Sequence, residues 1–445
     1  MKIVKWLKPG IKLKRWIALG GMGILFIVFA AVEFFTKNIT DKGYMFFYIF
    51  LIISGIFILY ISINQGIQSI ISLINQGYLN ISIDSTRLEN LICEKRLLVK
   101  GPKIVTIGGG TGLSTMLRGL KYYTSNITAI VTVGDDGGGS GALREELGIL
   151  PPGDIRNCIL ALADTEPLME DLLQYRFKEG NLKNQSFGNL FLAAMDGVSG
   201  NFEEAVQKMS SVLAVTGRVL PVTLDDMVLK AKLKNGNVVE GESNIPSEVK
   251  KQKSSIERIF IEPSDAKALS EAVEAILDAD AIILGPGSLY TSVIPNLLVK
   301  DISSALKDTK ALKLYVSNIM TQEGETDNYK VSHHIKAIFK HGGNGIIDYV
   351  ATNTKDINNI MMEKYLEKNA KQVEVDEKNI EDLGVKIVEG EFVTIKNGFV
   401  RHDPDKLAKF LMETIMDKKL LYDKRKILEY FYLSQRLKEN KRSKG

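Results

Sequence analysis

The stretch Lys103-IVTIGGGTGLSTMLRGL-Lys121 joins a β-branched run, a set of glycines and a helical pattern without interruption. Residues 103–107 have the composition of a buried strand, and the apolar spacing of residues 113–120 is typical of a helix. Glycines between them let the backbone turn tightly, and they leave its N–H groups and the positive helix end facing an anion. We therefore predict an α/β fold with a phosphate site at this turn, the alternative being a tight turn without a ligand. The predicted site residues are Gly108, Gly109, Gly110, Thr111 and Gly112.

The glycine spacing does not match either of the common phosphate loops. It reads G-x-G-x-G, whereas the dinucleotide fingerprint is G-x-G-x-x-G, and the lysine and hydroxyl of a P-loop are missing. This incomplete fingerprint disfavours an NAD-dependent dehydrogenase, and it leaves the class of nucleotide open.

A second strand of the same kind, residues 127–133, ends in Gly134, Asp135 and Asp136 before another helical start. In a Rossmann unit, the acid about 20 residues beyond the glycine turn binds a ribose hydroxyl, and Asp135 has that position. Two adjacent aspartates would also suit Mg²⁺ beside a diphosphate, because hard cations prefer carboxylate oxygens. Mg²⁺ is the one cofactor that we predict. The alternative is that one or both carboxylates cap the following loop.

Several later turns also carry small or polar residues at a strand end or a helix start. Arg156 suits a phosphate as well as it suits a pair with Asp154, and the loop after Asn318 adds Thr321, Gln322 and Glu325. Convergence of such loops at one edge of a parallel sheet predicts a nucleotide cleft. The further predicted ligand-binding residues are Arg156, Asn157, Ser186, Asn189, Gly285, Gly287, Ser288, Tyr290 and Asn318.

Two apolar runs of twenty residues, 16–35 and 44–63, precede this region, and Glu33 is the only charged residue in them. Twenty residues form about 30 Å of helix, enough for one bilayer crossing. The alternatives are a signal peptide and a hairpin buried in a soluble domain. A signal peptide has a single, shorter apolar run, and the helices of a soluble domain usually keep a polar face toward the solvent. We predict a transmembrane hairpin.

The charge distribution predicts the topology. Residues 1–15 carry six Lys or Arg and no acid, which favours a cytoplasmic N-terminus. Two crossings would return the chain to the cytoplasm. We therefore predict a multi-pass protein of the cell membrane whose main domain is cytoplasmic. Residues 417–445 carry ten basic and four acidic residues, so the net charge of +4 leaves −8 between these ends. A nucleic-acid-binding surface is therefore not expected on the main domain.

These observations define five predicted segments. They are a basic arm (1–15), a membrane hairpin (16–63), an amphipathic connector (64–100), a nucleotide-binding domain (101–416) and a basic helical tail (417–445).

The motifs together resemble those of a known family. GGGTGLSTMLRGLK, TAIVTVGDDGGGSG, ELGILPPGDIRNCILALAD, SFGNLFLAAM, GPGSLYTSVIPNLLV and NIMTQEGETDNY occur in the order found in the CofD/YvcK family, and specifically in its bacterial gluconeogenesis-factor branch. The resemblance covers residues 101–415. It departs from the family at Gln185, where a histidine is usual, and at Glu323, where a proline is usual.

The resemblance implies a Rossmann-like sheet with an added helical part, which binds a nucleotide diphosphate at its strand ends. One branch transfers a phospholactyl group from a guanosine diphosphate donor to a deazaflavin with Mg²⁺. The other binds UDP-sugars such as UDP-N-acetylglucosamine, and it serves cell shape and envelope synthesis during gluconeogenic growth. The ligand-binding tyrosine and arginine of that branch fall on Tyr365 and Arg401. A packing tyrosine and a surface arginine are the alternative.

We therefore predict a membrane-tethered regulator that binds a UDP-sugar, with a CofD-type transferase as the alternative. Envelope-synthesis proteins are the implied partners, and a homo-oligomer is left open. The membrane anchor and the segments of Tyr365 and Arg401 favour the regulator, because phospholactyl transfer requires neither.

Overall fold

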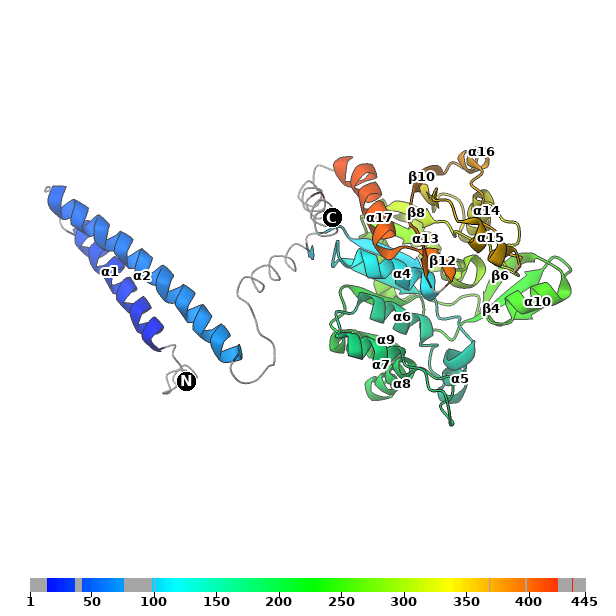
Figure 1. Cartoon of the computed structure of the whole chain (residues 1–445), viewed down its shortest axis with the longest axis horizontal. Coiled ribbons are helices and arrows are strands. Elements are labelled where there is room, and N and C mark those ends of the chain that lie inside the picture. Colours follow the sequence, from blue (N-terminus) through cyan, green and yellow to red (C-terminus); the bar gives the residue numbers. More distant parts are fainter. Residues whose placement is uncertain are drawn as a thin grey trace. The chain divides into compact units, whose positions relative to one another are not determined.

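The computed structural model describes residues 14–36, 42–75, 98–99, 101–367, 369–396, 398–422 and residue 434. It divides into two compact units, Met1–Arg96 and Leu97–Gly445 (Figure 1). The basic arm before residue 14, most of the connector beyond residue 75 and the greater part of the basic tail lie outside the described residues.

The first unit is a pair of helices, α1 (Lys14–Thr36) and α2 (Lys42–Asn75), packed side by side (Figure 1). A Cβ on Gly23 would lie 2.9 Å from the carbonyl oxygen of Gly55, and one on Gly55 would lie 2.8 Å from that of Gly23. The Ser62 hydroxyl donates to the Trp16 carbonyl at 2.5 Å. Small residues thus bring the two backbones close together, as is common between membrane helices.

The outward surfaces of both helices are apolar. Leu25 and Phe46 are each 67% exposed, so the two helices leave large apolar side chains uncovered within this unit. The segments 15–34 and 43–66 are long and apolar enough to cross a membrane. The second helix also continues twelve residues beyond the predicted span, to Asn75, because residues 64–75 contain no proline and only Gly66 disfavours a helix.

The second unit is built on a seven-stranded sheet whose order is β10-β9-β8-β7-β1-β2-β3. All neighbouring strands pair in parallel. The strands are β1 (Ile104–Gly108), β2 (Ile127–Val131), β3 (Arg218–Pro221), β7 (Ala281–Leu284), β8 (Leu312–Val316), β9 (Tyr349–Asn353) and β10 (Lys386–Gly390).

Burial explains the apolar character of these strands. Every residue of β1, β2, β7 and β8 is buried, as expected for parallel strands with helices on both faces. The strands predicted after Lys103, at 127–133 and before Gly285 all form, and the predicted Rossmann-like sheet is confirmed.

Two layers of helices cover the sheet. The crossover from β1 to β2 and the crossover from β7 to β8 step away from β1 in opposite directions, so right-handed connections put their helices on opposite faces. In one layer α4 contacts α6 and α17 (Figure 1). In the other layer α12 contacts α13 and α14. The layers contain α4 (Gly110–Leu120), α6 (Gly153–Leu162), α9 (Phe202–Val212) and α17 (Pro404–Lys418), and α11 (Ser270–Leu277), α12 (Ile294–Leu298), α13 (Lys300–Asp308) and α14 (Val331–Gly342).

Additions to this framework lie between the sheet strands. The chain between β2 and β3 forms the predicted helical part, which includes α5 (Gly138–Leu147), α7 (Pro167–Gln174) and α8 (Phe187–Ser199). A hairpin with Asn235 and Gly236 at its turn, as the residue types favour, forms between β4 and β5. The remaining elements are β4 (Val228–Leu233), β5 (Val238–Glu240), α10 (Ile245–Gln252), β6 (Ile256–Glu262), η2 (Leu289–Val293), α15 (Asn359–Leu366), α16 (Glu377–Glu381), β11 (Val393–Lys396), β12 (Phe399–His402) and η3 (Leu420–Tyr422).

The strand order determines where a ligand can bind. Strand β1 lies between β2 and β7. After β1 the chain continues to β2 on one side, and after β7 it continues to β8 on the other side. Open α/β sheets form their ligand crevice at such a switch point, beyond the carboxyl ends of the strands. The loops after β1, β7 and β8 meet there.

Candidate ligand-binding site

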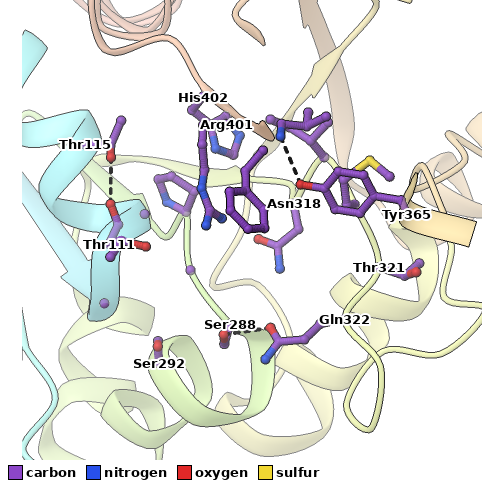
Figure 2. A pocket seen from close by; sticks show the side chains of 18 residues that line it. Thr111, Thr115, Ser288, Ser292, Asn318, Thr321, Gln322, Tyr365, Arg401 and His402 are labelled. Carbon is purple, nitrogen blue, oxygen red and sulfur yellow. Dashed lines mark hydrogen bonds between the residues drawn. The ribbon is translucent and has the colours of Figure 1, made fainter. Parts of the chain in front are cut away.

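A cavity of about 430 Å³ lies at this switch point. Its walls come from the start of α4, the loops after β7 and β8, and two C-terminal elements, α15 and β12 (Figure 2). The lining residues are Gly110, Thr111, Gly112, Thr115, Pro286, Gly287, Ser288, Ser292, Asn318, Ile319, Met320, Thr321, Gln322, Tyr365, Phe399, Val400, Arg401 and His402.

The glycine turn forms one wall because side chains would not fit there. A Cβ on Gly112 would lie 2.5 Å from the Pro286 carbonyl oxygen and 3.1 Å from the Gly287 nitrogen. Gly110 has φ +67°, a conformation that favours glycine. The first turn of α4 therefore borders the cavity with backbone, and the N–H groups of a first turn have no acceptor within their own helix.

Asp154 occupies part of the predicted anion site. Its Oδ2 accepts the Gly110 N–H at 2.6 Å, so this N–H is engaged by the protein itself. Burial and, to a lesser extent, the nearby Asp135 carboxylate raise the pKa of Asp154 to about 6, against the opposing effect of the Gly110 hydrogen bond. An anion at this turn would be bound by the N–H groups that follow Gly110.

Arg401 supplies a positive charge at the opposite side of the cavity. It belongs to β12, is exposed, and extends into the cavity (Figure 2). Its guanidinium lies 5.3 Å from the centre of the Phe399 ring. The two side chains are two residues apart on a strand and therefore share a face.

Tyr365 fixes the neighbouring part of β12. Its hydroxyl accepts the Val400 N–H at 2.9 Å, as the dashed line in Figure 2 shows. The next residue after Arg401, His402, is also at the wall, and burial lowers the pKa of its imidazole to about 4. At neutral pH the cavity therefore presents one guanidinium, two aromatic rings and a neutral imidazole.

Eight of the predicted residues line this cavity: Gly110, Thr111, Gly112, Gly287, Ser288, Asn318, Tyr365 and Arg401. Gly108 ends β1 directly below it, Gly285 follows β7, and Gly109 lies against the Asp154 carboxylate.

Arg156, Ser186 and Asn189 form a buried cluster outside the cavity lining. The Arg156 Nε donates to Asn189 Oδ1 at 3.1 Å, and the Ser186 hydroxyl accepts the Asn189 N–H as the N-cap of α8. Asn157 follows Arg156 in α6 and is half-buried. These residues connect α6 to α8.

Tyr290 is also not part of the lining. It is 4% exposed, and its hydroxyl lies 2.8 Å from that of Tyr329. Burial raises the pKa of Tyr290. Its side chain therefore belongs to the core beneath the loop after β7.

Asp135 and Asp136 engage different parts of the chain. Asp135 Oδ1 accepts the Gly137 N–H at 3.0 Å, whereas Asp136 Oδ1 accepts the Ser243 N–H at 2.9 Å. The Asp135 bond corresponds to the loop-capping alternative, whereas Asp136 is bonded to the turn after β5. Among the described residues, no group of three or more His, Cys, Asp or Glu is arranged to hold a metal ion. Each aspartate is thus bonded to a backbone N–H of its own, and Mg²⁺ binding by the pair beside a diphosphate stays a prediction.

Phe399 and His402 line the cavity although the sequence did not single them out. Thr321 and Gln322, which the sequence marked only as polar residues of the loop after Asn318, line it as well. The alternation of residues 399–402 in a strand is the signal that associates Phe399 with Arg401. The sequence shows Gln322 as a polar loop residue but does not show what it contacts, because its place depends on how the loop after β8 folds.

The fold and the cavity define an open α/β protein with a cleft at its switch point, the place where such folds bind ligands. The family model of 2-phospho-L-lactate transferase CofD matches residues 104–393. The chain belongs to this family, as the motifs predicted.

Curated relatives specify the branch. A gluconeogenesis factor of Bacillus subtilis is 47% identical over 317 residues, which are 71% of this chain and 99% of that protein. A relative from Clostridium acetobutylicum, which carries the same name provisionally, is 72% identical over 443 residues, 99% of this chain and 98% of its own length. The chain is thus similar to gluconeogenesis factors, and the Clostridium match includes the N-terminal unit.

A solved structure agrees with the fold. The crystal structure of a Bacillus halodurans protein has a TM-score of 0.68 and 46% identity, covering 71% of this chain and 99% of its own. That protein corresponds to the larger part of this chain and has no counterpart for the remainder.

Proposed function

We propose that the protein binds a UDP-sugar such as UDP-N-acetylglucosamine in the 430 Å³ cavity and acts as a regulator of envelope synthesis during gluconeogenic growth. The observation that carries this proposal is the exposed guanidinium of Arg401 opposite the backbone wall of α4. A diphosphate between them would meet a cation on one side and first-turn N–H groups on the other.

The aromatic side chains would select the base or sugar. Phe399 is 39% exposed and Tyr365 is half-buried, and both line the cavity beside Arg401. Rings of this kind stack on a base or on the apolar face of a sugar. The side chains of Asn318, Thr321 and Gln322 would add hydrogen bonds to the hydroxyl groups of a sugar.

One observation favours the transferase alternative. Next to the cavity, burial raises the pKa of Asp154 to about 6, and burial together with Asp135 and Glu325 raises that of Glu242 to about 8. Carboxyl groups with a pKa near the working pH are suited to general acid–base catalysis. A turnover assay with the transferase substrates therefore distinguishes the regulator from the transferase.

The full chain, reconstituted in lipid nanodiscs, should bind UDP-N-acetylglucosamine in calorimetry. When it is given a phospholactyl guanosine diphosphate donor, a deazaflavin and Mg²⁺, it should release no guanosine monophosphate. Binding is expected from the diphosphate contacts described above. No release is expected because a regulator does not transfer the phospholactyl group to an acceptor. Release of guanosine monophosphate without UDP-sugar binding would replace the regulator with the transferase.

The proposal includes a membrane tether with both the N-terminus and the larger unit in the cytoplasm. It rests on the apolar helices and on the six basic residues of positions 1–15. In intact cells, an impermeant thiol reagent should label Thr40→Cys, which lies between the two spans, and should spare Lys183→Cys, an exposed site of the larger unit. The reverse labelling pattern would contradict this topology.

A further inference from the structure

A buried carboxylate connects two walls of the cavity. Glu325 is 4% exposed and lies in the loop after β8, although it does not line the cavity itself. Its Oε1 accepts the Gln322 Nε2–H at 2.8 Å and the Thr291 hydroxyl at 3.2 Å, and its Oε2 accepts the Tyr290 N–H at 3.4 Å. One carboxylate thus joins the segment after β7 to the loop after β8.

The connection reaches the cavity through Gln322. The amide of Gln322 donates to Glu325, and its Oε1 accepts the Ser288 hydroxyl at 2.8 Å (Figure 2). Ser288 and Gln322 both line the cavity, from different loops. These two hydrogen bonds determine the orientation of the Gln322 amide, because its nitrogen faces a carboxylate and its oxygen faces a hydroxyl.

We propose that Glu325 is a positioning residue of the ligand site, which holds Ser288 and Gln322 in place by tying the loop after β7 to the loop after β8. Insofar as the ligand is a UDP-sugar, this inference rests on the proposed function. The positioning itself concerns the free protein.

The proposed role requires the ionised carboxylate. All three groups donate to Glu325, and two of them, the Tyr290 N–H and the Gln322 Nε2–H, cannot accept a hydrogen bond. A protonated carboxyl would therefore accept these bonds less well than the carboxylate does. Burial raises the pKa of Glu325 to about 7, against the opposing hydrogen bonds of Tyr290 and Thr291. The tie between the loops is therefore complete above this pH and weakens as the pH falls through it.

Other titratable groups face the same place and have to be separated from Glu325. Glu242, in the turn after β5, is hydrogen-bonded to Thr291 and senses Glu325, Asp135 and Asp154. At neutral pH Glu242 is mostly protonated, because burial and its acidic neighbours raise its pKa to about 8. The phenol of Tyr290 also lies nearby, but its raised pKa keeps it neutral throughout this range.

Hydrogen exchange of the free full chain in nanodiscs tests the positioning without a ligand. At pH 8, E325Q should increase deuterium uptake in residues 286–293 and 318–326, because its amide directs N–H groups at donors. The matched control is E323Q, the same change two residues away, where the side chain is bonded to Lys250 and Asn369 and not to the cavity. Uptake in E325Q equal to that of the wild type would overturn the inference.

Calorimetry with UDP-N-acetylglucosamine then measures the effect on binding. E325Q should bind about tenfold more weakly at pH 8, as expected for a hydrogen-bonded wall that is no longer held. Its affinity should change little between pH 8 and pH 6, whereas the wild type and E323Q should lose up to about tenfold over this range. A general loss of folding would instead lower the thermal stability of E325Q and leave the pH profile intact.

Two outcomes separate this inference from the proposed function. Normal binding by E325Q, with the pH profile of the wild type, would overturn the role of Glu325 and leave the UDP-sugar site standing. If the wild type binds no UDP-sugar while E325Q still loosens both loops, the positioning stands and the ligand is wrong. E242Q should keep a pH-dependent affinity, and a flat profile in that variant would assign the titration to Glu242.

Discussion

Arg401→Ala is expected to weaken UDP-N-acetylglucosamine binding by about 1.5–3 kcal/mol, the usual value of a hydrogen bond to a charged group in a desolvated site. Among the described residues, the Arg401 side chain is exposed and lies over the Phe399 ring, so its removal should leave the fold intact. The measurement is calorimetry on the full chain in nanodiscs, together with a thermal melt.

Two further variants define the cause of that loss. Arg401→Lys keeps the charge but not the planar fork, so it should recover only part of the affinity if the contact to the diphosphate is bidentate. Arg258→Ala removes an exposed arginine of β6 outside the cavity and should bind normally. Wild-type affinity in Arg401→Ala would exclude this side chain from the ligand site.

Gly112→Ala is expected to damage both stability and binding. The added Cβ would lie 2.5 Å from the Pro286 carbonyl oxygen, a backbone atom that can yield only if the loop after β7 moves. Such overpacking typically costs about 1–3 kcal/mol, and the better helix propensity of alanine offsets up to about 1 kcal/mol. Because Pro286, Gly287 and Ser288 form a wall of the cavity, the same shift should weaken ligand binding.

Gly197→Ala is the matched control for this change. Gly197 also lies within a helix, α8, but a Cβ there would meet no described atom within 4 Å. Alanine should therefore raise the free energy of unfolding by up to about 1 kcal/mol and leave binding unchanged. If Gly112→Ala behaves like Gly197→Ala in a thermal melt and in calorimetry, the close packing of α4 against the Pro286 loop is contradicted.

The sequence predicts the sheet because each of its strands can be recognised from a short, continuous segment. The runs that become β1, β2 and β7 are continuous and apolar, and each is followed by a glycine turn and a helix. The contribution of the C-terminal segments was not predictable in the same way. Strand β12 contacts α4, nearly 300 residues earlier in the chain, and α17, which follows β12, packs against the same helix.

The candidate site was predictable where strand ends determine it. Gly110, Gly112, Ser288 and Asn318 meet because parallel strands end at one edge of the sheet. Ser186 shows the limit, because a hydroxyl at a helix start has the same local sequence pattern whether it caps the helix or binds a ligand.

Gln322 and Glu325 show a second limit. Both were visible as polar residues of the loop after β8, but their roles depend on side chains from the loop after β7, more than thirty residues earlier. Local patterns do not report such contacts, so the tie between the two loops emerged only from the structure.

The central claim is that the cavity at the switch point is the nucleotide-sugar site, and a structure of the protein with UDP-N-acetylglucosamine tests it most directly. We predict density for the diphosphate between the first turn of α4 and the Arg401 guanidinium, with a ring of the ligand against Phe399 or Tyr365. Ligand density elsewhere, with the space between Gly112 and Arg401 left to solvent, would contradict the claim.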